Sequence, residues 1–216
     1  MIINLSEEHS VLHAWVRELR DITVQQDRMR FRRNLERIGE IAAYNLSKKL
    51  DWQPYEVETP LGTYTAHRLV TQPVVCSILR AGLPLHQGVL NYFDHADSAF
   101  VAAYRKHDND GSFHIAIEYI SCGDLNGRTV ILCDPMLATG ASLAKTALQL
   151  QNEISSMNLH IVAAIACTEG LEYVQRELPQ ATIWCGDIDD ELTAKGYIVP
   201  GLGDAGDLAF GEKLQQ

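Results

Sequence analysis

From residue 74 onward, short apolar runs alternate with longer stretches whose apolar residues recur at helical spacing. The runs predict strands over residues 74–79, 98–104, 130–133, 161–167 and 182–185. Helices are expected over residues 85–92, 142–153 and 171–178. This alternation favours an α/β fold, with a mostly parallel sheet flanked by helices. Four consecutive apolar residues at 130–133 fit a strand that is covered on both faces.

Residues 1–50 show a helical pattern instead. Ser6 is expected to cap a first helix that reaches about Arg20, and Thr23 with Gln26 matches a capping box for a second helix. An apolar stripe then recurs at helical spacing and needs a cover, from the sheet or from another subunit: Phe31, Leu35, Ile38, Ala42 and Leu46. The same helix carries a run of arginines that is typical of a solvated face: Arg28, Arg30, Arg32, Arg33 and Arg37.

Two segments depart from the alternation of strands and helices. Residues 56–70 predict a hairpin around Pro60-Leu61-Gly62, and residues 106–127 hold a polar turn and an amphipathic strand at 113–120. The sequence HDNDG at 107–111 is expected to be a turn rather than a metal site, because the remaining ligands of a calcium loop are missing. No linker or repeat divides the chain, so we expect a single domain over residues 1–216.

Composition and charge narrow the class of protein. A chain of 216 residues with 46% hydrophobic and 21% charged residues is typical of a soluble globular protein with a sizeable core. It lacks an apolar run of about 18 residues and a signal-peptide pattern, so we expect a cytoplasmic protein without a membrane partner. The net charge of −10 argues against a nucleic-acid partner, which needs a basic face. A local anion pocket stays possible, because a few arginines and amides suffice.

The cysteines and histidines do not indicate a disulfide framework or a zinc site. The five cysteines are odd in number and show no C-x-x-C spacing: Cys76, Cys122, Cys133, Cys167 and Cys185. Four of them lie in or beside apolar strand patterns, where cysteine acts as a small core residue. No pair among the eight histidines has helical ligand spacing around an acid.

The strand expected at 130–133 leads into a segment suited to phosphate. Asp134 follows the strand, and small and hydroxyl-bearing residues at 139–142 precede the next helix. Their N–H groups and hydroxyls, with the positive end of the helix dipole, favour an anion. Asp134 is a poor phosphate ligand, but it suits the hydroxyls of a sugar that carries the phosphate. The segment therefore predicts a site for a ribose 5-phosphate, the alternative being an ordinary strand–turn–helix connection.

A glycine-rich segment at 196–207 contains a formal match to the dinucleotide fingerprint, GLGDAG. No helix of useful length follows it and no acid lies about twenty residues further on, so we reject a dinucleotide site. Its glycines and its proline make a rigid loop whose amides and carbonyls can approach a flat ligand closely. The alternative is a generic glycine-rich loop.

Several of these segments resemble type I phosphoribosyltransferases. DPMLATGAS at 134–142 resembles the loop that binds phosphoribosyl diphosphate (PRPP), and its Asp-Pro pair is similar to one branch of the superfamily, uracil phosphoribosyltransferase. Residues 78–82 resemble the diphosphate loop, and this resemblance implies a cis Leu79–Arg80 peptide. Residues 196–207 resemble the uracil-binding loop, whose backbone amides and carbonyl would read one edge of the base. The alternative for Arg80 is a surface cation at a strand end.

The resemblance implies a set of site residues. Those expected to bind PRPP are Arg80, Arg105, Asp134, Pro135, Met136, Leu137, Ala138, Thr139, Gly140, Ala141, Ser142 and Asp204. Those expected to bind uracil are Tyr197, Ile198, Gly203, Asp204 and Ala205. The expected catalytic residues are Arg80, Arg105 and Asp204, of which the two arginines would stabilise the departing diphosphate. No side chain is an obvious base for the N1 proton of uracil, and Asp204 is the candidate.

The resemblance also implies an activity: uracil and PRPP give UMP and diphosphate, a step of pyrimidine salvage. Mg²⁺ is the expected cofactor, held through PRPP without direct ligation by a side chain. Residues 106–127 would be a flexible arm that closes over the site, and residues 186–216 would form the C-terminal base-binding loop. A homodimer or higher homo-oligomer is implied, and GTP is an effector of some relatives.

Three other functions are compatible with parts of this pattern. They are a silent sensor of the same fold, an RNA-binding attenuation regulator, and a phosphoribosyltransferase for another base. The charge opposes the second, and the backbone pattern of the uracil loop opposes the third. Two residues depart from the family pattern. Ala141 replaces a common glycine, and its methyl group is tolerated only if Ala141 has a negative φ. Leu208 replaces a residue that is usually polar or basic. We expect both departures to be neutral.

Overall fold

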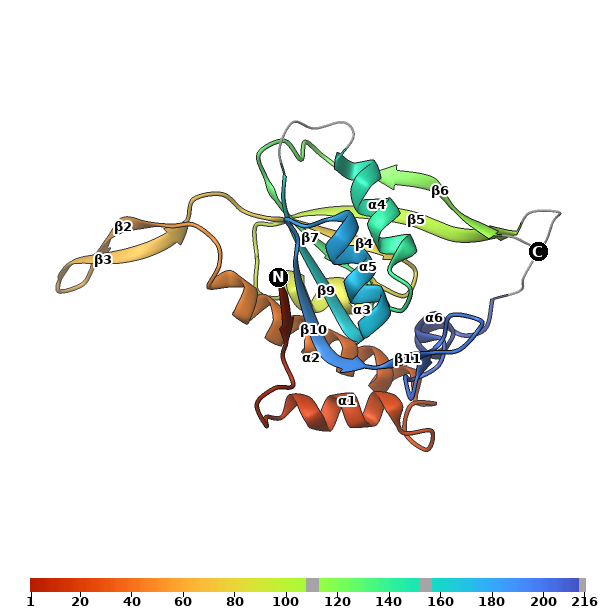
Figure 1. Cartoon of the computed structure of the whole chain (residues 1–216). Helices are drawn as coiled ribbons and strands as arrows, with labels where there is room; N and C mark the ends of the chain where they lie inside the picture. The colour runs from red at the N-terminus through yellow and green to blue at the C-terminus, as the bar shows by residue number, and fades with distance from the viewer. Residues whose placement is uncertain (108–112, 152–156, 214–216) are drawn as a thin grey trace.

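The computed structural model describes residues 1–107, 113–151 and 157–213, with the backbone alone for residues 104–107 and 113–116. A mostly parallel sheet lies at its centre, with helices on both faces (Figure 1). The strands of this sheet are β1 (Ile2–Asn4), β4 (Val74–Leu79), β5 (Asp97–His107), β6 (Phe113–Ser121), β7 (Thr129–Cys133), β8 (Met136–Leu137), β9 (Asn158–Cys167) and β10 (Thr182–Asp189).

Two hairpins and six helices complete the described fold. The hairpins are β2 (Trp52–Thr59) with β3 (Gly62–Leu69), and β11 (Glu191–Leu192) with β12 (Ile198–Val199). The helices are α1 (Leu12–Arg20), α2 (Arg28–Ser47), α3 (Leu83–Leu90), α4 (Ala141–Gln151), α5 (Thr168–Glu177) and α6 (Ala205–Phe210). In the central sheet the order is β1-β10-β9-β7-β4-β5-β6, with β8 beside β9 and β6 antiparallel to β5.

Most of the elements predicted from the apolar pattern are confirmed. The strand expected at 74–79 is β4, and the hairpin expected at 56–70 is β2–β3. The strands expected at 98–104 and 161–167 lie within the longer β5 and β9. Of the turn expected at 107–111, His107 ends β5 and the other residues lie outside the described ones.

The prediction of an entirely helical segment over residues 1–50 is wrong at its start. Residues 2–4 form β1, which pairs in parallel with residues 183–185 of β10. A strand of three residues is too short to show a period in the sequence, so its partner determines its conformation. The terminal ammonium of Met1 extends this pairing, because it donates to the Ala181 carbonyl at 2.9 Å.

Both predicted helix caps are also wrong. Ser6 donates its hydroxyl to the carbonyl of Gly186 in β10, and α1 begins only at Leu12. The second helix is capped by Asp27, whose Oδ1 accepts the Arg30 N–H at 3.0 Å. Thr23 instead donates to Asp21. Asp and Thr are both good caps, so the pattern could not select between two sites so close together.

The arginines of α2 do not form a simple solvated face. Arg30 makes a bidentate pair with Glu18 of α1, at 2.7 and 2.8 Å. Arg32 donates to the carbonyl of Ala209 at 2.7 Å, and Arg33 pairs with Glu36 of its own helix. The contacts of Arg30 and Arg32 bind α2 to α1 and to α6.

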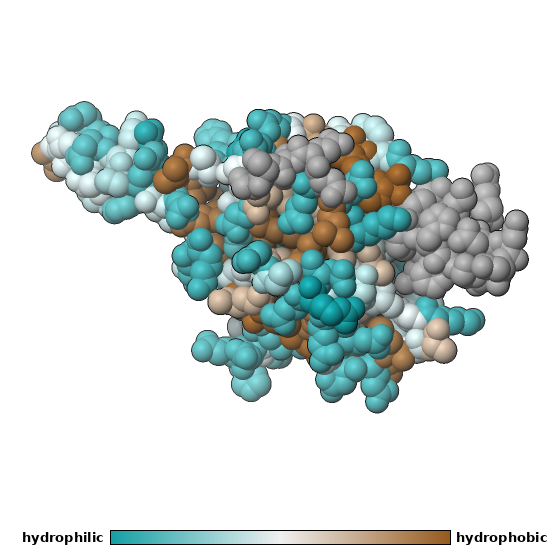
Figure 2. All heavy atoms as spheres, turned by 45° about the horizontal axis from the view of Figure 1, so that its top comes forward, coloured by the Kyte–Doolittle hydropathy of each residue, from teal (hydrophilic) through white to brown (hydrophobic). Residues whose placement is uncertain are grey.

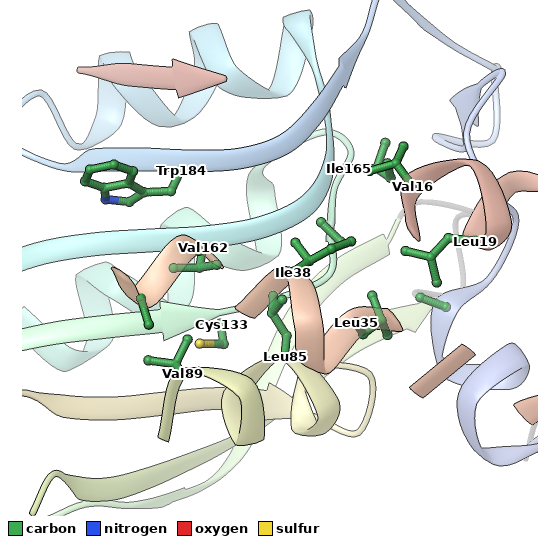
Figure 3. Packing of buried hydrophobic residues seen from close by; sticks show 14 of the residues in the cluster. Val16, Leu19, Leu35, Ile38, Leu85, Val89, Cys133, Val162, Ile165 and Trp184 are labelled. Carbon is green, nitrogen blue, oxygen red and sulfur yellow. The ribbon is translucent and has the colours of Figure 1, made fainter. Parts of the chain in front are cut away.

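The core lies on both faces of the sheet because successive strand residues point to opposite sides. Val75, Cys133 and Val162 belong to the cluster beneath α2 and α3, part of which Figure 3 shows. Their chain neighbours Val74, Leu132 and Ile161 belong to the cluster beneath α4 and α5. The predicted α2 stripe is confirmed, since Phe31, Leu35, Ile38, Ala42 and Leu46 are all at most 1% exposed. Each such large side chain contributes roughly 1.5–3 kcal/mol.

The β2–β3 hairpin projects from the body of the molecule (Figure 1). Its surface is largely hydrophilic in the view of Figure 2, although the Trp52, Tyr55 and Tyr64 side chains are exposed. Of the cysteines, four are buried as expected and Cys122 is exposed. Within the described part of the chain, no helix has the length and apolar character needed to cross a membrane.

Helices α2 and α3 approach each other closely at two glycines. A Cβ at Gly88 would overlap the carbonyl of Glu36, and one at Gly39 would overlap the carbonyl of Leu85. We predict that Gly88→Ala lowers the free energy of unfolding by about 1–3 kcal/mol, because the backbones must separate. Thermal denaturation followed by circular dichroism measures this loss.

Gly123→Ala is the matched control for this prediction. Gly123 is exposed, and a Cβ there would meet nothing within 4 Å. Its substitution should leave the melting temperature unchanged or slightly higher. An equal effect of the two substitutions would show that the helix contact does not limit stability.

Candidate active site

The segments singled out by the sequence meet at the carboxyl ends of two neighbouring strands. β4 and β7 are parallel partners. β4 leads through α3 to β5 on one side, whereas β7 leads through α4 to β9 on the other. The connections therefore leave in opposite directions, which is the place where open α/β sheets bind ligands. Residues 80–82 follow β4 and residues 134–142 follow β7, so both segments lie at this point.

The segment after β4 packs directly against the end of β7. The Leu79–Arg80 peptide is cis, as the resemblance implied. A Cβ at Gly82 would lie 2.5 Å from the Cys133 carbonyl oxygen and 2.7 Å from Ser77 Oγ. Only glycine allows this approach, which brings the segment after β4 against the end of β7.

The loop after β7 runs along β9 before it enters α4. The Asp134 N–H donates to the Val162 carbonyl at 3.1 Å, and the Pro135 carbonyl accepts from the N–H groups of Ala164 and Ile165. Met136 and Leu137 then form β8, a short strand that the sequence interpretation had treated as loop. Backbone pairing thus determines the course of the loop.

At the start of α4 the loop is held by its glycine. Gly140 has a φ of +75°, and a Cβ there would lie 2.7 Å from the Gly170 carbonyl oxygen and from Val174 Cγ2. Ala141 donates its N–H to Thr139 Oγ1 at 3.4 Å. Ala141 does not have a positive φ, so the condition set for this departure from the family pattern is met.

Asp134 is the acid at the centre of this arrangement. Asp134 is only partly exposed, and its Oδ1 accepts the Met136 N–H at 3.4 Å. Burial raises the pKa of Asp134 to about 7, and the Met136 hydrogen bond opposes this rise. The carboxylate therefore needs partners that the ligand-free protein does not supply, and sugar hydroxyls would be suitable ones.

Arg80 joins the β4 segment to the C-terminal segment. Its Nη2 donates to Asp207 Oδ1 at 2.8 Å and also to the Gly211 carbonyl. Both contacts use one nitrogen, so Nε and Nη1 carry the other three donors of the guanidinium. A Cβ built on Gly206 would lie 3.8 Å from Arg80 Nε, which again places this segment beside Arg80.

The C-terminal segment presents its predicted residues in different ways. Ile198 is buried, whereas Tyr197 is exposed and its N–H and carbonyl both bond to Thr193. Asp204 caps α6, because its Oδ1 accepts the Asp207 N–H at 2.9 Å. Ala205 follows as the first, buried residue of that helix.

Three further predictions concern Gly203, Arg105 and the arm. Gly203 is exposed, with a φ of +99°. The Val199–Pro200 peptide is cis, a feature that the sequence did not suggest. Arg105 lies in β5 opposite Ile115 of β6, but its side chain is outside the described residues. The arm predicted over 106–127 is likewise described only in part, as the antiparallel pair β5–β6 and the segment after it.

The family model for "Uracil phosphoribosyltransferase" matches residues 6–212 of this chain. The chain belongs to the uracil phosphoribosyltransferase family. A uracil phosphoribosyltransferase from Porphyromonas gingivalis is 47% identical over 214 residues, which cover 99% of each chain. One from Methanococcus maripaludis is 37% identical and aligns over 95% of this chain and 88% of the relative.

Solved structures show the same architecture. The AQ2163 protein from Aquifex aeolicus superposes with a TM-score of 0.84 at 31% identity, over the full length of both chains. TT1426 from Thermus thermophilus shares the fold alone, with a TM-score of 0.51 at 15% identity over 76% of this chain and 86% of that one.

One residue that contacts the predicted site was not identified from the sequence. Asp207 holds Arg80, yet it carried no assigned role. The signal was present, because Asp204 and Asp207 stand at capping-box spacing before a short apolar run. The sequence interpretation expects no helix of useful length after this segment, but residues 205–210 form the short helix α6, whose first turn carries the acid that contacts Arg80.

We predict that Asp134→Asn stabilises the ligand-free protein at pH 8. Because the pKa of Asp134 is higher in the folded than in the unfolded chain, the folded state binds the proton more tightly. Stability is therefore lost as pH rises from about 4 through about 7, and asparagine, which stays neutral, avoids this loss.

Melting temperatures of both proteins between pH 4.5 and pH 8 measure this effect. The variant should melt at a higher temperature at pH 8, and its advantage should shrink toward pH 4.5. An advantage of the same size at every pH would show that ionisation of Asp134 is not the cause.

Proposed function

We propose that this chain transfers the 5-phosphoribosyl group of PRPP to N1 of uracil, giving UMP and diphosphate, as in pyrimidine salvage. The observation that carries the proposal is the meeting of three segments. Residues 80–82 and 134–142 follow adjacent parallel strands, and Arg80 contacts residues 207 and 211 of the C-terminal segment. Relatives named uracil phosphoribosyltransferase that align over nearly the full chain support the same pair of substrates.

The 5′-phosphate binds at residues 139–142, where α4 begins. Backbone N–H groups and the Thr139 and Ser142 hydroxyls lie there, and the positive end of the helix dipole favours the anion. Asp134 accepts hydrogen bonds from the ribose hydroxyls. These bonds favour the ionised carboxylate, so binding of the sugar lowers the raised pKa of Asp134.

The diphosphate leaves as the bond from C1′ to its oxygen breaks and the bond from C1′ to N1 of uracil forms. Arg80 and Arg105 stabilise the departing charge, a role that suits the forked donors of arginine. Asp207 and the Gly211 carbonyl orient the Arg80 guanidinium through Nη2, which directs its other donors to the ligand. Arg80 thereby couples the diphosphate site to the base-binding loop.

Mg²⁺ would be held by oxygens of PRPP, without direct ligation by a side chain, and would neutralise part of the charge of the leaving diphosphate. Among the described residues no group of three or more His, Cys, Asp or Glu side chains is placed to hold a metal. Asp134 is followed by Pro135, so this position offers one carboxylate and not a pair of adjacent acids.

Uracil binds against the C-terminal segment with N1 toward C1′. Backbone groups near Ile198, Gly203 and Ala205 read one edge of the base, and the Tyr197 ring is exposed beside them. Asp204 uses Oδ1 to cap α6, so Oδ2 is the candidate acceptor for the N1 proton. Closure of the β5–β6 arm would exclude water from the sugar cation.

We extend the proposal to the state of the protein in the cell. It is a single domain over residues 1–216 that works in the cytoplasm as a homodimer or higher homo-oligomer, with GTP as a possible effector. The projecting hairpin supports the oligomer, because an isolated two-stranded hairpin is marginally stable in water. Its exposed Trp52, Tyr55 and Tyr64 side chains would gain a partner surface.

The first test is UMP formation from uracil and PRPP with Mg²⁺, beside parallel reactions with cytosine, hypoxanthine and orotate. We predict turnover with uracil, at least about 10⁴-fold faster than with cytosine, because a site built to pair the uracil edge leaves groups unpaired against cytosine. Binding of PRPP without turnover of any base would favour a sensor of the same fold instead.

We predict that Asp204→Asn and Arg105→Ala each lower kcat by about 10²-fold or more without unfolding the protein. Asparagine caps a helix as well as aspartate does, so Asp204→Asn removes the charge and keeps α6. Steady-state kinetics and melting temperatures separate the two effects.

Asp51→Asn is the control, since Asp51 is exposed and lies before β2, away from the site. It should leave both kcat and the melting temperature unchanged. A variant of Asp204 or Arg105 with wild-type kcat would remove that residue from the catalytic assignment.

A further inference from the structure

A hydrogen-bond network ties the base-binding loop to the first helix of the chain. Arg20, the last residue of α1, donates to Asp189 through both terminal nitrogens, at 2.7 and 2.8 Å. It also donates to Asp187 Oδ2 at 2.8 Å and to the Gly201 carbonyl at 3.0 Å. Four bonds account for the four hydrogens on its terminal nitrogens, so the guanidinium is held in one orientation.

Asp189 closes the network on the loop. Its Oδ2 accepts the Gly201 N–H at 3.0 Å, so the N–H and the carbonyl of Gly201 are both held. Gly201 has a φ of +56°, and a Cβ there would overlap the Ile198 carbonyl. Gly201 therefore has no side chain that could anchor it, and its position depends on the backbone hydrogen bonds to Arg20 and Asp189.

Gln25 makes a second attachment one residue further along the loop. Its side chain is buried, and its Nε2 donates to the Leu19 carbonyl at 2.8 Å and to the Leu202 carbonyl at 3.1 Å. Leu19 precedes Arg20 in α1. Arg20 at the end of α1 and Gln25 in the segment after it therefore hold two consecutive loop residues, Gly201 and Leu202, through two independent side chains.

These two residues lie between the proposed contacts to the base. Ile198 precedes them and Gly203 follows them directly. A change in the backbone of Gly201 or Leu202 therefore moves the groups that face uracil on both sides. The PRPP segments after β4 and β7 make none of the bonds of this network.

The burial of Arg20 and Asp189 indicates that the network determines the conformation of the loop rather than adding to the stability of the fold. The side chains of Arg20 and Asp189 are 18% and 7% exposed. Ion pairs buried to this degree add little net stability, because desolvation offsets their attraction. Their geometry instead selects one arrangement of the groups that they bond, which here is the arrangement of the loop.

We propose that Arg20, Asp189 and Gln25 are positioning residues that set the affinity for uracil by holding Gly201 and Leu202. This inference rests on the proposed function, since it assigns the loop to uracil. The three side chains act through the loop backbone and do not touch the substrate. Their loss weakens uracil binding and leaves PRPP binding as it was.

The test is Arg20→Lys, which keeps the charge but replaces a planar fork by a single ammonium that cannot span Asp189 and Gly201 together. Uracil KM should rise about tenfold, whereas kcat and the PRPP KM should change less than about twofold. Hydrogen exchange should become faster in peptides that cover residues 198–203. Gln25→Met, which loses both hydrogen bonds at similar volume, should shift the same two readouts.

Arg30→Lys is the matched control. Arg30 makes an equally bidentate pair with Glu18 between α1 and α2, but that pair does not contact the loop. It should leave the uracil KM and exchange over residues 198–203 unchanged. Increases of similar size in the KM values for uracil and PRPP, or loss of the folded state in both test variants, would overturn the inference and leave a purely structural role.

The outcome with the unmodified protein separates this inference from the function on which it rests. Absence of uracil turnover there would overturn both. Turnover there together with an unchanged uracil KM in Arg20→Lys and Gln25→Met would overturn the inference alone.

Discussion

Burial of both faces of the central sheet is the constraint on which the rest of the structure depends. Helices α2 and α3 cover one face and α4 and α5 cover the other, so the buried side chains of β4, β7 and β9 are mostly apolar on both sides. Charged groups are thereby excluded from the strands and confined to the ends. The reversal of connections between β4 and β7 then leaves Arg80 and Asp134 at the carboxyl ends of these strands, where open α/β sheets bind ligands.

Close backbone contacts fix the two loops that meet at this point of the sheet. Gly82 and Gly140 each occupy places where a Cβ would meet a carbonyl oxygen of another segment. The two loops after β4 and β7 are therefore positioned by packing, before any ligand contributes. A site prepared in this way loses little free energy in ordering itself when a charged substrate arrives.

The elements that could be predicted from the sequence are those that depend on residues close together in the chain. The α2 stripe beginning at Phe31, the β4 run and the loop after β7 could each be recognised because they depend on local spacing. Contacts between distant segments could not be predicted. Three residues of β1 carry no period of their own, and nothing near Arg20 indicates a partner 169 residues away. Asp207 lies between these cases, since its local spacing was visible but its contact with Arg80 was not.

Residues near the start of the chain reach their partners at 181–201 only in the finished fold. Met1 bonds to Ala181, 180 residues later, and Arg20 bonds to Asp189 and Gly201. At a synthesis rate of about 5–20 residues per second, these first residues wait roughly ten to forty seconds for their partners to emerge from the ribosome. The edge strand β1 and the glycine-rich loop are therefore completed last, and a chain released before residue 196 would hold Arg20 and Gln25 without the loop that they bond.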